Sequence, residues 1–177
     1  STKIKVNDSK GSAALARAIP IGLLFAGDSK AAFDEAVRAA ALSHSNPVGY
    51  YAAGGLAAMI SCLAYGLTLP KALERAETLL GKVHKTDPIL SLLGAAEEQA
   101  NNHPAGKSGT WDHIDSIVSL GSGENAEEAL AIAVYCILAE DDPLNALIVS
   151  ANHSGKSSTT AAITGALEGI RFGTGFI

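Results

Sequence analysis

The chain has 177 residues and a formal net charge of −5, with 47% hydrophobic, 18% charged and 5% aromatic residues. A chain of this length predicts one domain, residues 1–177, with a substantial core. The negative charge argues against a nucleic-acid partner, which calls for a basic face. Neither a membrane-spanning apolar run nor a basic leader is evident, so we expect a cytoplasmic protein without a membrane partner.

Few aromatic residues and abundant alanine and leucine are typical of closely packed helices rather than of a β-sandwich. We therefore expect an all-α fold, an orthogonal multi-helix bundle. Cys62 and Cys136 both lie in apolar helical patterns, which predicts buried thiols and neither a disulfide nor a metal site.

Three helical patterns occupy the first half of the chain, over residues 13–25, 30–42 and 51–67. Pro20 should kink the first of them, and Asp28 or Ser29 should cap the second. The third follows a break over residues 43–50 and is apolar on all sides, which predicts a buried central helix.

In the second half, proline in a first turn predicts helix starts at Leu69-Pro70, Asp87-Pro88 and Asp142-Pro143. Residues 126–138 form a further strong helical pattern, and a last helix should follow a polar loop and end near Arg171. Three large apolar residues are predicted to lie in the core: Met59, Tyr65 and Trp111. Three histidines lack the spacing of metal ligands: His84, His103 and His113.

The polar loop before the last helix carries the clearest motif. Residues 150–165 read Ser-Ala-Asn-His-Ser-Gly-Lys-Ser-Ser-Thr-Thr-Ala-Ala-Ile-Thr-Gly. This segment resembles the signature of the ADP-ribosylglycohydrolases, where His-Ser-Gly-Asp-Ser-Asp-Thr precedes a Gly-Ala-Ile-Thr-Gly-like helix. The resemblance implies that family's all-helical fold and its hydrolysis of ADP-ribosyl bonds, for which two magnesium ions activate the reacting water or ribose.

This sequence departs from the signature at the two aspartates, whose positions are taken by Lys156 and Ser158. In the family those carboxylates hold the magnesium ions, which prefer anionic oxygen ligands. Ser157 and Thr159 match the family, which makes Ser157 a candidate ligand contact and leaves Thr159 as a vestigial metal ligand. We therefore expect no magnesium cofactor and impaired hydrolysis.

A second motif stands near the N-terminus, where residues 7–12 read Asn-Asp-Ser-Lys-Gly-Ser. This segment looks like the family's loop that contacts ADP-ribose. The resemblance implies that Ser9, Gly11 and Ser12 cradle the diphosphate or the distal ribose, as backbone N–H groups at a helix start attract anions. An ordinary capped helix start is the alternative.

Two further motifs lie between these. Residues 41–50 resemble the family's Leu-Thr-His segment, which makes His44 a candidate contact to a phosphate or ribose hydroxyl, or otherwise a cap. Gly121 and Gly123 match a Gly-x-Gly stretch before an Ala-Glu-Glu-Ala-Leu helix, and both are candidate ligand contacts. Glu124 stands where the family often has an aromatic residue.

The two glutamates that open this helix, Glu127 and Glu128, complement the helix dipole, and we do not interpret them as a catalytic pair. Gly155-Lys156-Ser157 also suggests a nucleotide-hydrolysing phosphate loop. That motif requires glycine or alanine at Ser150 and a downstream acidic strand, so we reject it. Lys156 remains a candidate point charge on a bound phosphate.

The resemblance leaves three functions open. The first is metal-free binding of ADP-ribose or a related nucleotide, with Lys156 in place of magnesium. The second is one piece of a split hydrolase, since family members are longer and carry further metal ligands upstream, so this chain corresponds to a truncated, C-terminal part of their domain. The third is a non-enzymatic scaffold whose exposed apolar face is covered by a second copy or a complementing protein half.

Overall fold

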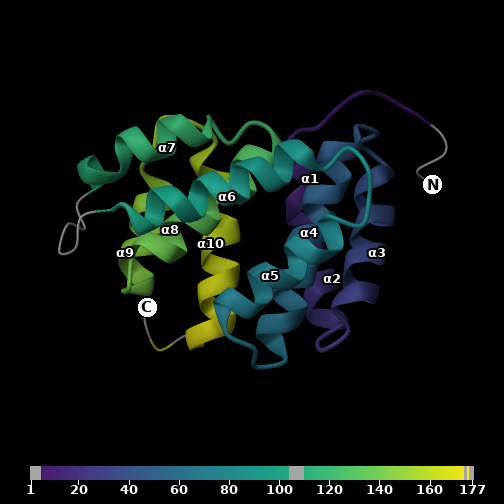
Figure 1. Cartoon of the computed structure of the whole chain (residues 1–177), viewed down its shortest axis with the longest axis horizontal. Coiled ribbons are helices and arrows are strands. Elements are labelled where there is room, and N and C mark those ends of the chain that lie inside the picture. Colours follow the sequence, from purple (N-terminus) through teal and green to yellow (C-terminus); the bar gives the residue numbers. More distant parts are fainter. Residues whose placement is uncertain (1–4, 104–109, 174, 176–177) are drawn as a thin grey trace.

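The computed structural model describes residues 5–103, 110–173 and 175, with Thr110 and Trp111 described by their backbone only. Within these residues all regular structure is helical, apart from one isolated bridge between Gly11 and Asn125. The prediction of an all-α fold is therefore confirmed. The helices α1 to α4 gather on one side of the molecule and α7 to α9 on the other, and α6 runs obliquely from one side to the other below α7 (Figure 1).

The elements follow one another in this order: α1 (Ala13–Ala16), α2 (Ala18–Leu24), α3 (Ser29–Ala41), α4 (Pro47–Ala64), α5 (Leu69–Leu80), α6 (Asp87–Asn101), the 3₁₀ helix η1 (Thr110–His113), α7 (Ile114–Leu120), α8 (Ala126–Ala139), α9 (Pro143–Ala151) and α10 (Ser157–Phe172).

The central helix is α4, which packs against α1, α2, α3, α5, α8 and α10. Small residues allow these close approaches: a Cβ added to Gly54 would lie 2.7 Å from Val37 Cγ2. The expectation that no segment has membrane-spanning length was wrong, because α4 is an 18-residue helix with a mean hydropathy of 1.3. However, 78% of it is buried in the protein, as in the core helix of a globular domain.

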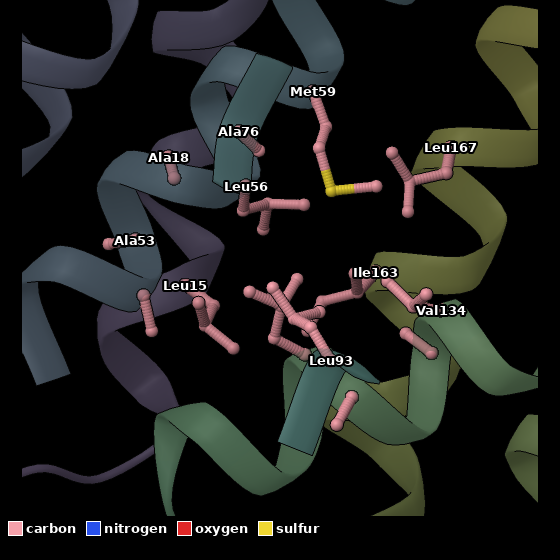
Figure 2. Close-up of a cluster of buried hydrophobic side chains, with 14 of the residues drawn as sticks. Leu15, Ala18, Ala53, Leu56, Met59, Ala76, Leu93, Val134, Ile163 and Leu167 are labelled. Carbon is pink, nitrogen blue, oxygen red and sulfur yellow. The ribbon is translucent and has the colours of Figure 1, made fainter. Parts of the chain in front are cut away.

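A second buried helix, α8, packs against α4, α6, α9 and α10. Where the two meet, side chains from five helices converge, as Figure 2 shows: Leu15, Leu56, Met59, Leu93, Val134, Ile163 and Leu167. Met59 is wholly buried, as predicted. Burying a side chain of this size stabilises the fold by about 1.5–3 kcal/mol. Because the cluster takes side chains from α1 and α4 as well as from α8, it holds the two sides of the molecule together.

Local sequence signals account for most helix starts. Asp28 caps α3 by accepting a hydrogen bond from the Ala31 N–H, and Asp142 caps α9 through the Leu144 N–H. The helix expected from residue 51 begins earlier, at Pro47, because Asn46 accepts from the Val48 N–H. The first helical pattern breaks at Arg17, three residues before Pro20, since proline offers no N–H to the preceding turn.

The exposure of Tyr65 and of the two cysteines can be compared with what the sequence predicted. Tyr65 was predicted to lie in the core but is 71% exposed, because it follows the last residue of α4. Cys62 and Cys136 are free and buried, as predicted. The side chain of Trp111 lies outside the described residues.

Candidate functional site

The loop of residues 121–125 joins two motifs that are far apart in the sequence. On one side, the Ser12 N–H donates to the Glu124 carbonyl and the Ala126 N–H donates to the Lys10 carbonyl, both at 2.8 Å. On the other side, the Lys156 N–H donates to the Ser122 carbonyl at 2.7 Å. The N-terminal loop, the Gly-x-Gly loop and the signature loop therefore form one continuous structure, which we call the motif loops (residues 7–12, 121–125 and 152–158).

Glu128 holds the Gly-x-Gly loop in shape. Its Oε2 accepts hydrogen bonds from the backbone N–H groups of Ser122 and Gly123 at 3.0 and 3.1 Å, and its Oε1 accepts from Asn125 Nδ2 at 2.6 Å. Burial acts to raise the pKa of Glu128, but these hydrogen bonds together bring it below its usual range. The helix-dipole interpretation of this residue was thus incomplete, because the carboxylate bonds specific donors.

Glycines permit the close contact between the Gly-x-Gly loop and the signature loop. A Cβ added to Gly155 would lie 1.8 Å from the Ser122 carbonyl oxygen, a distance too short for any side chain at this position. Gly123 has a φ of +77°, in the left-handed region, and faces Lys156 and Thr160. Both glycines are therefore required by the backbone path.

The signature loop is braced from inside by His153, which was not among the predicted site residues. His153 Nδ1 accepts from the Gly155 N–H at 3.1 Å, and its Nε2 lies 2.8 Å from Thr160 Oγ1. Burial lowers the pKa of His153, which favours the neutral ring with its proton on Nε2. Thr160 is wholly buried and its hydroxyl donates to the Ser150 carbonyl at 2.8 Å.

Lys156 lies at the rim of the motif loops. Its Nζ is 3.7 Å from Glu124 Oε2, and the two side chains are 48% and 64% exposed. Both residues depart from the family pattern: Lys156 adds a cation and Glu124 adds an anion. The fold places these two charges next to one another. An exposed pair of this kind contributes little to stability, so an anionic ligand can displace Glu124 from Lys156 at a small cost in free energy.

The candidate residues of the first two motifs also come together. Gly11 lies beside the His44 ring, since a Cβ added to Gly11 would be 3.7 Å from His44 Nε2. The Gly11 N–H donates to Ser9 Oγ at 3.4 Å. His44 and Ser12 are nearly buried, and burial followed by the charge of Arg17 lowers the pKa of His44.

Glu127 connects α8 to the N-terminal loop through an ion pair with Lys10, at 2.5 Å between Nζ and Oε1. Its side chain is 5% exposed, and Oε2 has no hydrogen-bond partner among the described residues. This pair fixes the loop that carries Ser9 and Gly11, so Glu127, like Glu128, has a more specific role than complementing the helix dipole.

The residues present do not fit the family's pair of magnesium ions. Lys156 brings an ammonium group to the loop, and Ser158 is an exposed residue with a neutral hydroxyl. Thr159 is half-buried, and one hydroxyl does not hold two hard cations. Over residues 5–103, 112–173 and 175, no group of three or more acidic, histidine or cysteine side chains close enough to share an ion lies at the motif loops.

A pocket of about 360 Å³ adjoins the motif loops. Its apolar side comes from α7 through Ile114, Ile117 and Val118, and its polar side comes from Asn152 and His153 of the signature loop. Neither α7 nor this pocket was expected from the sequence.

The family model described as ADP-ribosylglycohydrolase matches residues 2–177, so the chain belongs to the ADP-ribosylglycohydrolase family. No curated protein matches the chain.

Proposed function

We propose that the chain binds ADP-ribose or a related nucleotide at the motif loops without a metal ion and without efficient hydrolysis. The observation that carries this proposal is Lys156, an exposed cation at the position of a metal-binding aspartate in the family signature. A diphosphate needs a positive partner, and an ammonium group supplies a compact point charge of the kind that binds phosphates in other proteins.

The other sequence candidates take supporting roles in this proposal. Ser9, Gly11 and Ser12 approach the distal ribose or the diphosphate, and the ring of His44 beside Gly11 offers a neutral donor or acceptor to a hydroxyl. Ser157 at the start of α10 adds a hydroxyl near Lys156. Gly121 and Gly123 act by shaping the loop, because the Gly123 N–H is already donated to Glu128.

The pocket beside α7 suits the base of the nucleotide. Its volume of about 360 Å³ lies within the usual range of small-molecule sites. Its aliphatic side chains offer a flat apolar surface, while Asn152 offers amide groups that fit the edge of a base. The base would thus be held without the aromatic residue that Glu124 replaces.

The proposal is tested by calorimetric titration of ADP-ribose into the wild type and a Lys156→Ala variant, both in chelator. The variant has no ammonium group to donate a charge-assisted hydrogen bond to phosphate, so its binding should be weaker by about 10- to 100-fold. Lys82→Ala, on the exposed turn after α5, is the matched control and should bind like the wild type. Equal affinities of wild type and Lys156→Ala would contradict the proposal.

A scaffold function is the second candidate, favoured by apolar side chains at one end of the molecule. Leu24, Tyr65 and Phe172 are 78%, 71% and 48% exposed. Leu67 belongs to two neighbouring pockets, one that also includes Tyr65 and one that also includes Phe172. A second copy would bury this face, and light scattering at increasing concentration tests it. A chain that stays monomeric argues against this function.

A further inference from the structure

Three side chains with metal-ligand chemistry meet outside the motif loops: His103 after α6, His113 at the end of η1, and Glu140 after α8. One ligand atom from each lies within 4.8 Å of the others. His113 is wholly buried, Glu140 is 6% exposed and His103 is partly buried. The sequence spacing of His103 and His113 is not that of metal ligands, and their approach to one another depends on the fold.

His113 is held on both ring nitrogens. Its Nε2 lies 2.7 Å from Glu140 Oε1, and its Nδ1 lies 2.8 Å from the hydroxyl of Tyr135. The ring of His103 stacks on it with centroids 4.1 Å apart and an angle of 12° between the planes. Burial lowers the pKa of His113, the hydrogen bond to Glu140 opposes this effect, and the charge of His103 reinforces it.

We propose that His103, His113 and Glu140 form a binding site for a divalent transition-metal ion, with zinc as the preferred occupant. Two imidazoles and one carboxylate are a common zinc ligand set, whereas magnesium avoids imidazole. A histidine that binds a metal through one ring nitrogen normally forms a hydrogen bond to an oxygen through the other. In His113 the Tyr135 hydroxyl holds Nδ1, which directs Nε2 toward the metal. None of these three residues belongs to the motif loops.

The metal would take the place of the proton shared by His113 Nε2 and Glu140 Oε1. Binding of one ion breaks that hydrogen bond and forms one metal–nitrogen and one metal–oxygen bond there, while the ring proton of His113 moves from Nε2 to Nδ1 and donates to the hydroxyl oxygen of Tyr135. The third bond forms to a nitrogen of His103, whose ring must turn out of the stack because a metal lies in the plane of the imidazole that binds it. Water completes the coordination shell.

Such an ion would tie the end of α6 and η1 to the end of α8. η1 leads directly into α7, which lines the pocket beside the signature loop. The site therefore has a structural role, to fix α7 on the body of the protein.

The test is titration of the whole chain with zinc, and with cobalt as a spectroscopic probe. We expect one zinc ion per chain, a higher melting temperature, and a visible cobalt spectrum of a four- or five-coordinate ion. His103→Ala should lose at least about 100-fold in affinity, and Tyr135→Phe about 10- to 100-fold, the usual cost of losing a group that orients a metal ligand.

His84→Ala is the control, because His84 is an exposed histidine outside the cluster. The far-UV circular dichroism spectrum of each metal-free variant, compared with that of the wild type, checks that the variant is folded. The proposal is overturned if the folded wild type binds no zinc at a stoichiometry of one, or if His84→Ala loses as much affinity as His103→Ala.

Discussion

Lys156 Nζ and Glu124 Oε2 lie 3.7 Å apart where the signature loop meets the Gly-x-Gly loop. Each is a charged residue at a position where the family pattern has a different type, and the negative charge of Glu124 offsets part of the positive charge that Lys156 adds. The pairing also means that an anionic ligand and Glu124 compete for the same cation.

Glu124→Gln should therefore strengthen ADP-ribose binding. An exposed ion pair is worth about 0.2–1 kcal/mol, so freeing Lys156 should lower the Kd by about 1.5- to 5-fold in low salt. Calorimetry measures this, with Glu98→Gln on α6 as the control. Weaker binding by Glu124→Gln would mean that Glu124 contacts the ligand itself.

Gly155→Ala should damage the motif loops. The added methyl group would meet the Ser122 carbonyl at 1.8 Å, so the two loops must separate and the Lys156 N–H must release that carbonyl. We expect a loss of about 1–3 kcal/mol in unfolding free energy and a loss of ligand binding. Gly94→Ala, in the exposed interior of α6 with nothing within 4 Å of the new Cβ, should instead stabilise by about 0.5–1 kcal/mol. Urea titration of both variants separates these outcomes.

Glu128→Gln should loosen the Gly-x-Gly loop. The amide replaces one carboxylate oxygen by an NH₂ group, while the four donors from Ser122, Gly123 and Asn125 all require acceptors. We expect a loss of about 1–3 kcal/mol in unfolding free energy and faster hydrogen exchange at Gly123. Unchanged exchange at Gly123 would show that the loop holds its shape without the carboxylate.

Stability should fall in mild acid in part through His153. Burial lowers its folded pKa below the ordinary value of 6.5, so the unfolded state binds more protons below that pH, and stability falls as pH decreases through the folded pKa. His153→Gln should therefore show a smaller drop in melting temperature between about pH 7.5 and about pH 5.5 than the wild type. Parallel pH profiles for the two proteins would contradict the neutral assignment of this ring.

The sequence predicted those parts of the fold that local chemistry decides. Asp28 and the prolines at positions 70, 88 and 143 mark helix starts that the structure confirms. The earlier start of α4 was missed because Asn46-Pro47 was interpreted as a break, although an N-cap followed by proline is also a helix start.

What the sequence could not predict depends on contacts between distant segments. The meeting of Lys156 with Glu124, and of His113 with Glu140, joins residues whose separation in the chain carries no periodic signal. Tyr65 was misplaced for a related reason, since the apolar helix was expected to continue to residue 67, whereas α4 ends at Ala64 and leaves Tyr65 exposed.

The central claim is that Lys156 replaces magnesium, and the affinity of the wild type for ADP-ribose with and without magnesium tests it most directly. We expect the same Kd, within about 2-fold, in chelator and in millimolar magnesium, since Lys156 and its neighbours in the signature loop offer the ion no anionic ligand. Binding that requires magnesium, or magnesium-dependent release of ADP-ribose from a modified substrate, would contradict the account.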